Sequence, residues 1–186
     1  YSDQQINDGL WYIVNVVASN HMYSLQRERV PLPARKSCIR SIYTLYEKLF
    51  AIRCTPTLSH LNEHGNPMNL VCYMWWEVTL QGRPKGSYVE KMGVSPEHRG
   101  EQMAYVRSFD ADEYRQIEYT IIGVMKQILE LKSDACRESA LHGLGHWSRY
   151  YGKAVQNIID KWLRRHPDLR PELRDYAERT KFDAIP

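Results

Sequence analysis

The sequence predicts an all-α protein, and two observations carry that prediction. Apolar residues recur at intervals of three and four through most of the chain, which is the spacing of a helix with one buried face. In the C-terminal third these amphipathic runs follow one another with only short links, a pattern typical of neighbouring antiparallel helices. We therefore expect successive helices that share one core.

The first clear helix is predicted from Arg35 to Arg53. Its apolar residues form two adjacent rows, the first with Cys38, Ile42, Leu45 and Leu49 and the second with Ile39, Tyr46 and Phe50. Pro31 and Pro33 stand just before this helix and Pro56 soon after it, where proline is expected at a helix boundary.

The segment from Leu70 to Leu80 fits either a buried helix or a strand, because nearly every position is apolar and periodicity does not decide between them. We favour a helix because the rest of the chain has a helical pattern. The residues that follow, Gly82 to Arg107, combine glycines, prolines and mixed charges. They are predicted to form a long irregular connection, which is uncommon unless it has a function.

A further helix is predicted after this connection, with Asp110 as its cap and Glu113 three residues later in a variant of the capping box. It reaches Leu131, and one face carries Tyr114, Ile117, Ile121, Val124, Met125 and Ile128. The next helix is predicted to begin after Ser133 or Asp134. Its buried face carries Ala140, Leu141, Leu144, Trp147 and Tyr151.

Gly152 is predicted to end that helix, because glycine is common just after a helix C-terminus. The following helix ends at His166 and Pro167, and its apolar residues are Val155, Ile158, Ile159, Trp162 and Leu163. The short link between the two predicts an antiparallel hairpin. Pro171 then suits the first turn of a last helix, whose apolar residues are Leu173, Tyr176 and Ala177.

Length and composition indicate a single helical domain over residues 1–186. The chain is 43% hydrophobic and 25% charged, which is typical of a folded globular chain and excludes a disordered or fibrous one. Its longest strongly apolar stretch, Leu10 to Ala18, is about half the roughly 20 residues that a membrane-spanning helix needs. A formal charge of +3 is too small to predict a nucleic-acid partner.

Cysteine usage favours a cytoplasmic protein. No CxxC pair occurs among Cys38, Cys54, Cys72 and Cys136, so we interpret all four as reduced core residues rather than as a zinc cage or a disulfide framework. Because the chain starts at Tyr1 without the pattern of a signal peptide, we expect it to be a fragment of a longer protein.

Residues 134–145 resemble the first helix of a HEAT-type (armadillo-like) repeat. The residues that carry the resemblance are Asp134, Cys136, Arg137, Ala140, Leu144 and Gly145. An earlier segment repeats part of this spacing with Arg35, Cys38, Ser41 and Ile42. The resemblance implies helix pairs stacked as an α-solenoid, in which small residues such as Ala140 and Gly143 let neighbouring helices approach closely.

The repeats are unevenly spaced, because Arg35 and Arg137 lie 102 residues apart and the connection between them fits no repeat of about 40 residues. We therefore expect a short, degenerate HEAT-like array. An irregular helical bundle is the alternative, since small and apolar residues also take such spacings there.

Glu138, His142 and His146 are four residues apart in succession, so a helix places them along one face as metal ligands can be. The alternative is a surface ion pair between Glu138 and His142, because helical projection places both opposite Ala140 and Leu144, on the polar side. No glutamate directly follows His142 to act as a general base. A second four-spaced pair, His60 and His64, is expected in a loop or cap, because Gly65, Asn66 and Pro67 follow.

Aromatic residues gather in the ambiguous segment, where Tyr73, Trp75 and Trp76 lie beside Glu77. Tyrosine and tryptophan are preferred anchors of protein interfaces, and with Arg149 these residues are candidates for a binding surface. The alternative is that the aromatic residues belong to the core.

These observations favour a protein-interaction or scaffold module whose partner is another protein or another part of the full-length chain. We expect no cofactor, no membrane association and no catalytic chemistry, because the sequence carries no recognised catalytic motif. An enzyme or a ligand- or metal-binding domain that uses Glu138, His142 and His146 is the alternative. A HEAT-like nucleic-acid binder is a second one, which the near balance of charge disfavours.

Overall fold

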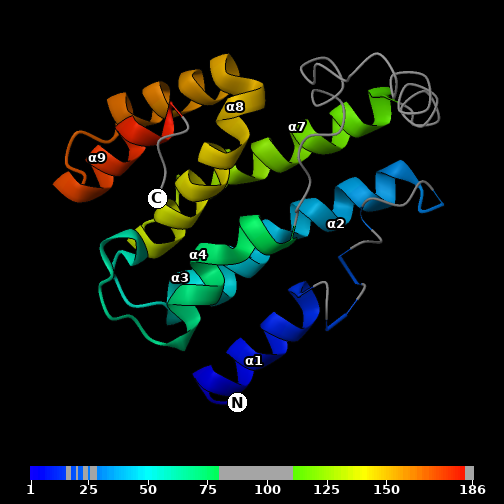
Figure 1. Cartoon of the computed structure of the whole chain (residues 1–186), viewed down its shortest axis with the longest axis horizontal. Helices are drawn as coiled ribbons and strands as arrows, with labels where there is room; N and C mark the ends of the chain where they lie inside the picture. The colour runs from blue at the N-terminus through cyan, green and yellow to red at the C-terminus, as the bar shows by residue number, and fades with distance from the viewer. Residues whose placement is uncertain (16–17, 20, 23–24, 26–28, 80–110, 183–186) are drawn as a thin grey trace, which may run out of the picture.

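The computed structural model of the chain is all-helical in the part that it describes (Figure 1). It describes residues 1–182 apart from 16–17, 20, 23–24, 26–28 and 80–110, and no strand occurs among these described residues. The predicted connection from Gly82 to Arg107, Leu80 and the predicted cap Asp110 all lie outside the described residues. None of the described helices is both long and apolar enough to cross a membrane.

Within residues 32–79 and 111–180 the helical elements follow one another with short links. The described elements are α1 (Asp3–Val14), α2 (Leu32–Leu45), the π-helical turn η2 (Tyr46–Phe50), α3 (Ala51–Arg53), the 3-10 turn η3 (Ser59–Leu61), α4 (Pro67–Thr79), α7 (Ala111–Ile128), α8 (Asp134–Arg165) and α9 (Pro171–Thr180).

Four of the predicted helices are confirmed, among them the one predicted to reach Leu131, which is α7 and ends at Ile128. The helix predicted from residues 35 to 53 is α2, η2 and α3 in one run, which begins slightly earlier because Pro33 is tolerated in a first helical turn. The ambiguous aromatic segment is α4, a helix. The last helix, α9, begins at Pro171 as predicted.

The predicted boundary between two helices at Gly152 lies one residue earlier, at Tyr151. α8 (Asp134–Arg165) consists of two helical parts joined directly at this residue, whose φ of −118° and ψ of 31° are not helical. In Figure 1 its yellow and orange halves run in different directions. Tyr151 donates a hydrogen bond to Glu118 of α7 and stacks on Trp147 within α8, so one contact with the neighbouring helix and one within α8 fix its side chain at the kink.

Neighbouring helices share one core. α4 packs against both α1 and α8, α7 packs against α2 and α8, and α9 packs against α8. Ala140 and Leu144 of α8 are fully buried in this core, as predicted. Of the four free cysteines only Cys72 and Cys136 are buried, so the prediction that all of them are core residues is wrong for the exposed Cys38 and the half-buried Cys54.

Gly143 marks the closest approach in the core, where α8 meets α4 and α7. A Cβ atom at this position would lie 2.6 Å from the Sδ atom of Met125 and 2.7 Å from the Cβ atom of Trp76. Trp76 cannot give way easily, because its Cβ is attached directly to the backbone of α4. The absent side chain of Gly143 therefore sets how close α4 and α8 lie.

We predict that Gly143→Ala lowers the free energy of unfolding by up to about 2 kcal/mol. The overpacking cost of about 1–3 kcal/mol outweighs the roughly 1 kcal/mol that alanine contributes through its helix propensity. Gly123→Ala in α7 is the matched control, because a Cβ there meets nothing within 4 Å. It is expected to raise stability by up to about 1 kcal/mol, and urea unfolding of both variants measures the difference.

Candidate metal centre

Two helices bring three potential metal ligands together. His142 and His146 lie one turn apart on α8, and Glu77 lies on the adjacent helix α4. One nitrogen from each imidazole and one carboxylate oxygen all lie within 4.8 Å of one another. The sequence predicted the two histidines as a pair, and the fold supplies the carboxylate from a distant segment.

The distances between the ligand atoms suit a tetrahedral ion. The Nε2 atoms of His142 and His146 are 3.2 Å apart, and the Oε2 atom of Glu77 lies 3.4 Å from the first and 3.9 Å from the second. Ligands at about 2.0–2.1 Å from a tetrahedral zinc ion are separated by about 3.4 Å. Two neutral imidazoles that face each other share one hydrogen at most, whereas a cation satisfies all three groups at once.

Exposure differs sharply across the cluster. The side chain of His142 is only 3% exposed, whereas those of His146 and Glu77 are 41% and 45% exposed. An ion bound here is therefore anchored on the buried His142 and open to solvent on its other side. This leaves room for a water molecule or another exchangeable ligand beside the three protein ligands.

Two tyrosine side chains contact His142 on the side of the ring that faces away from Glu77 and His146. The Nδ1 atom of His142 lies 2.9 Å from the hydroxyl of Tyr176 on α9, and that hydroxyl lies 3.2 Å from the hydroxyl of Tyr73 on α4. The ring of Tyr73 also leans against His142, with 4.2 Å between ring centroids. Because Nδ1 is occupied in this way, Nε2 is the nitrogen that faces Glu77 and His146.

The environment keeps His142 neutral. Burial, reinforced by the neighbouring His146, lowers the pKa of His142 from 6.5 to about 4, although Glu77 acts in the opposite direction. A histidine must be unprotonated at the nitrogen that binds a metal. His142 is therefore in the form that binds a metal throughout the neutral pH range.

Glu138 takes a different role from the predicted one. Its carboxylate is 1% exposed and accepts hydrogen bonds from the backbone N–H of Ser59 at 2.9 Å and from the backbone N–H of His60 at 2.8 Å. It also contacts Nδ1 of His60 at 2.6 Å. The predicted surface ion pair between Glu138 and His142 is wrong, because both side chains are buried and each has other partners.

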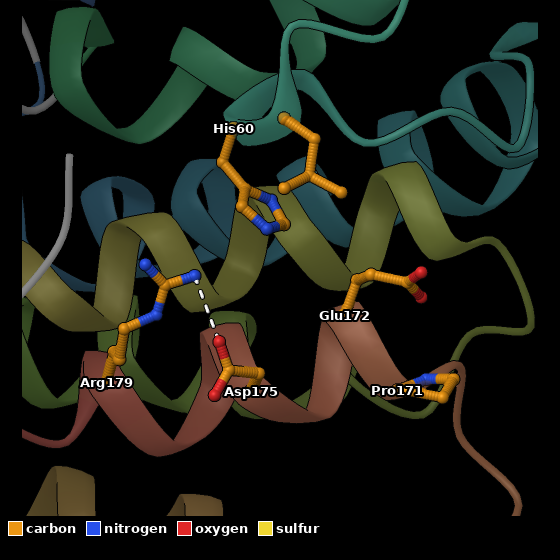
Figure 2. Close-up of a pocket in the computed structure, with 6 residues that line it drawn as sticks. His60, Pro171, Glu172, Asp175 and Arg179 are labelled. Atoms are coloured by element: carbon orange, nitrogen blue, oxygen red, sulfur yellow. Dashed lines mark ion pairs between the residues drawn. The ribbon is translucent and has the colours of Figure 1, made fainter.

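His60 lies in the turn η3, in agreement with the predicted loop or cap position. Its ring stacks on that of Tyr176, with 4.1 Å between centroids. Beside it is a cavity of about 270 Å³, lined by His60, Leu61, Pro171, Glu172, Asp175 and Arg179. Figure 2 shows this cavity between η3 and α9, with the ion pair of Asp175 and Arg179, and none of the three candidate metal ligands lines it.

The predicted binding surface is only partly exposed. Trp75 and Trp76 are buried, so the prediction that they anchor a partner is wrong and the alternative core position is correct. Trp76 stacks on Tyr46, with 5.9 Å between centroids. Tyr73 is half-buried within the network behind His142, and Arg149 is exposed on α8.

Fold and site together define an all-helical domain with a candidate metal centre. In comparisons with known proteins, no family model, no curated protein and no solved structure matches the chain. The resemblance to HEAT-type repeats therefore stays a prediction that rests on its motif.

Glu138→Gln is predicted to lower the free energy of unfolding by about 1–3 kcal/mol, because an amide cannot accept at both ends and one buried donor then loses its partner. Glu77→Gln is the matched control, since this side chain is 45% exposed and we expect a change within about 0.5 kcal/mol. Urea unfolding of the metal-free proteins measures both. Equal losses would contradict the structural role assigned to Glu138.

The lowered pKa of His142 predicts a loss of stability in acid. Between pH 6.5 and about 4 the unfolded chain binds a proton that the folded chain does not, so stability falls as the pH drops through this window. The loss amounts to up to about 3 kcal/mol. Unfolding of metal-free wild type and His142→Gln over this range should give a steeper pH dependence for the wild type, and equal slopes would refute the assignment.

Proposed function

We propose that this protein binds a single zinc-like divalent metal ion through Glu77, His142 and His146. The observation that carries the proposal is the convergence of two imidazole Nε2 atoms and one carboxylate oxygen at separations of 3.2, 3.4 and 3.9 Å. The buried and neutral His142, held at its other nitrogen by Tyr176, supports it. The metal set predicted from sequence keeps its two histidines and exchanges Glu138 for Glu77.

The ligand types favour a transition metal over magnesium or calcium. Imidazole nitrogens suit zinc, copper, iron and nickel, whereas magnesium and calcium prefer a shell of oxygen atoms. Among the transition metals, zinc fits the ligand separations of a tetrahedral site. This proposal replaces the expectation that the protein has no cofactor.

Three protein ligands with an open side resemble a catalytic zinc site more than a structural one, because structural zinc sites take four protein ligands. Zinc at such a site lowers the pKa of a bound water molecule to about 7, which makes hydroxide available at neutral pH. Hydrolysis is therefore the reaction class that this geometry supports best. Metal binding is the primary proposal, and catalysis depends on it.

An interaction module remains a second proposal. It is supported by the way neighbouring helices share a core, with Gly143 at a close helix approach and Ala140 and Leu144 fully buried. Stacked helices of this kind form degenerate HEAT-like arrays that present a surface to another protein. Cytoplasmic location and the nucleic-acid alternative stay predictions.

The metal proposal predicts that purified wild-type protein, dialysed against zinc and then against buffer, retains one zinc ion per chain by elemental analysis. Glu77→Ala, His142→Ala and His146→Ala should each weaken zinc binding by more than the roughly 10–100-fold that loss of an outer-shell partner costs. Isothermal titration of the metal-free proteins gives the dissociation constants.

His64→Ala is the matched control for these variants, because His64 is exposed and does not belong to the cluster. It should bind zinc as the wild type does. Stoichiometric zinc that survives in all three ligand variants, or a wild type that retains none, would overturn the proposed function.

A further inference from the structure

Tyr176 contacts residues from three other elements close to the candidate metal centre, α8, α4 and η3. It comes from α9, is fully buried, and its hydroxyl contacts Nδ1 of His142 on α8 and the hydroxyl of Tyr73 on α4. Its ring stacks on His60 of η3, which Glu138 holds in place. Through this hydroxyl, α9 makes a hydrogen bond with one of the three candidate ligands, His142.

The direction of these hydrogen bonds depends on the metal. Without an ion, Nδ1 of His142 can either donate to the Tyr176 hydroxyl or accept from it, because either ring nitrogen of a neutral imidazole can carry the hydrogen. An ion on Nε2 requires that lone pair, so the hydrogen must then lie on Nδ1. The Tyr176 oxygen accepts it, and the Tyr176 O–H group donates onward to the oxygen of Tyr73, 3.2 Å away.

We propose that Tyr176 is a positioning residue that couples the metal ion to the docking of α9. Its hydroxyl holds His142 in the tautomer and ring orientation whose Nε2 binds the ion, and the bound ion in turn strengthens the contact between α9 and α8. Coupling of this kind is reciprocal, so whatever detaches α9 weakens the bound metal by the same factor. The inference rests on the proposed function, because it requires an ion at Glu77, His142 and His146.

Tyr176→Phe removes the hydroxyl and keeps the ring that stacks on His60. It is expected to weaken zinc binding about 10–100-fold in isothermal titration. Thr180→Val is the matched control on the same helix, because it removes a buried hydroxyl whose hydrogen bond goes only to the backbone oxygen of Tyr176. This control should bind zinc with wild-type affinity.

Hydrogen exchange tests the coupling itself. Zinc should slow amide exchange in α9 of the wild type and of Thr180→Val, and should have a much smaller effect on α9 in Tyr176→Phe. A purely structural role would lower the melting temperature of metal-free Tyr176→Phe and leave its zinc affinity unchanged. That result, in a wild type that does bind zinc, overturns the inference and leaves the proposed function standing.

Nitrogen-15 NMR of the imidazoles provides a readout that needs no variant. In the zinc-loaded wild type, His142 should carry its hydrogen on Nδ1 and bind zinc through Nε2, with the Nδ1–H proton protected from exchange with water. Zinc on Nδ1, or an Nδ1–H proton that exchanges freely, would overturn the role of Tyr176. A wild type that binds no zinc would instead remove the proposed function itself.

Discussion

The contact between Gly143 and Trp76 is the constraint on which the candidate centre depends. A Cβ on Gly143 would lie 2.7 Å from that of Trp76, so α8 and α4 approach as closely as they do only because this position has no side chain. The residues next to this pair are His142 and Glu77, whose ligand atoms lie 3.4 Å apart. The same approach that completes the core therefore brings the carboxylate within reach of the imidazoles, and a wider helix separation would leave two histidines without a third ligand.

The first half of α8 is buried on more than one side, which is unusual for an amphipathic helix and shapes its chemistry. Its apolar residues face α4 and α7, while Glu138 and His142 are covered by η3 and α9. Polar groups buried in this way need partners, because an unsatisfied buried group costs about 1–3 kcal/mol. Glu138 finds three donors in η3, and His142 finds Tyr176. The hydrogen bond with Tyr176 therefore fixes the orientation of the His142 ring that an ion would bind.

Local periodicity was enough to predict most of the helices, because the apolar face of a helix is formed by residues that are close in sequence. It did not decide between helix and strand for α4, and α1 (Asp3–Val14) was not predicted. It could not reveal Glu77, since nothing in the sequence relates this residue to a histidine 65 positions later until α4 packs on α8. Helical projection placed Glu138 on a solvent-facing side, and it failed because η3 covers that side. The break at Tyr151 was predicted one residue later, at Gly152, whereas the hydrogen bond from Tyr151 to Glu118 of α7 could not be predicted from sequence. Spacing within one helix identified the histidine pair. The residues that other helices contribute to the site, Glu77 and Tyr176, could be identified only from the folded structure.

An ion at this site would join segments that are distant in the chain. Glu77 belongs to α4, the two histidines to α8, and the hydroxyl behind them to α9. Because the unfolded chain cannot hold these groups together, the free energy of metal binding also stabilises the fold, most of all the packing of these three helices. The exposed half of the centre leaves the ion accessible, so one set of contacts serves both stability and chemistry. A fourth protein ligand would close the site, which would add stability and remove that access. The side chains of His146 and Glu77 are 41% and 45% exposed, which favours a site with an open position.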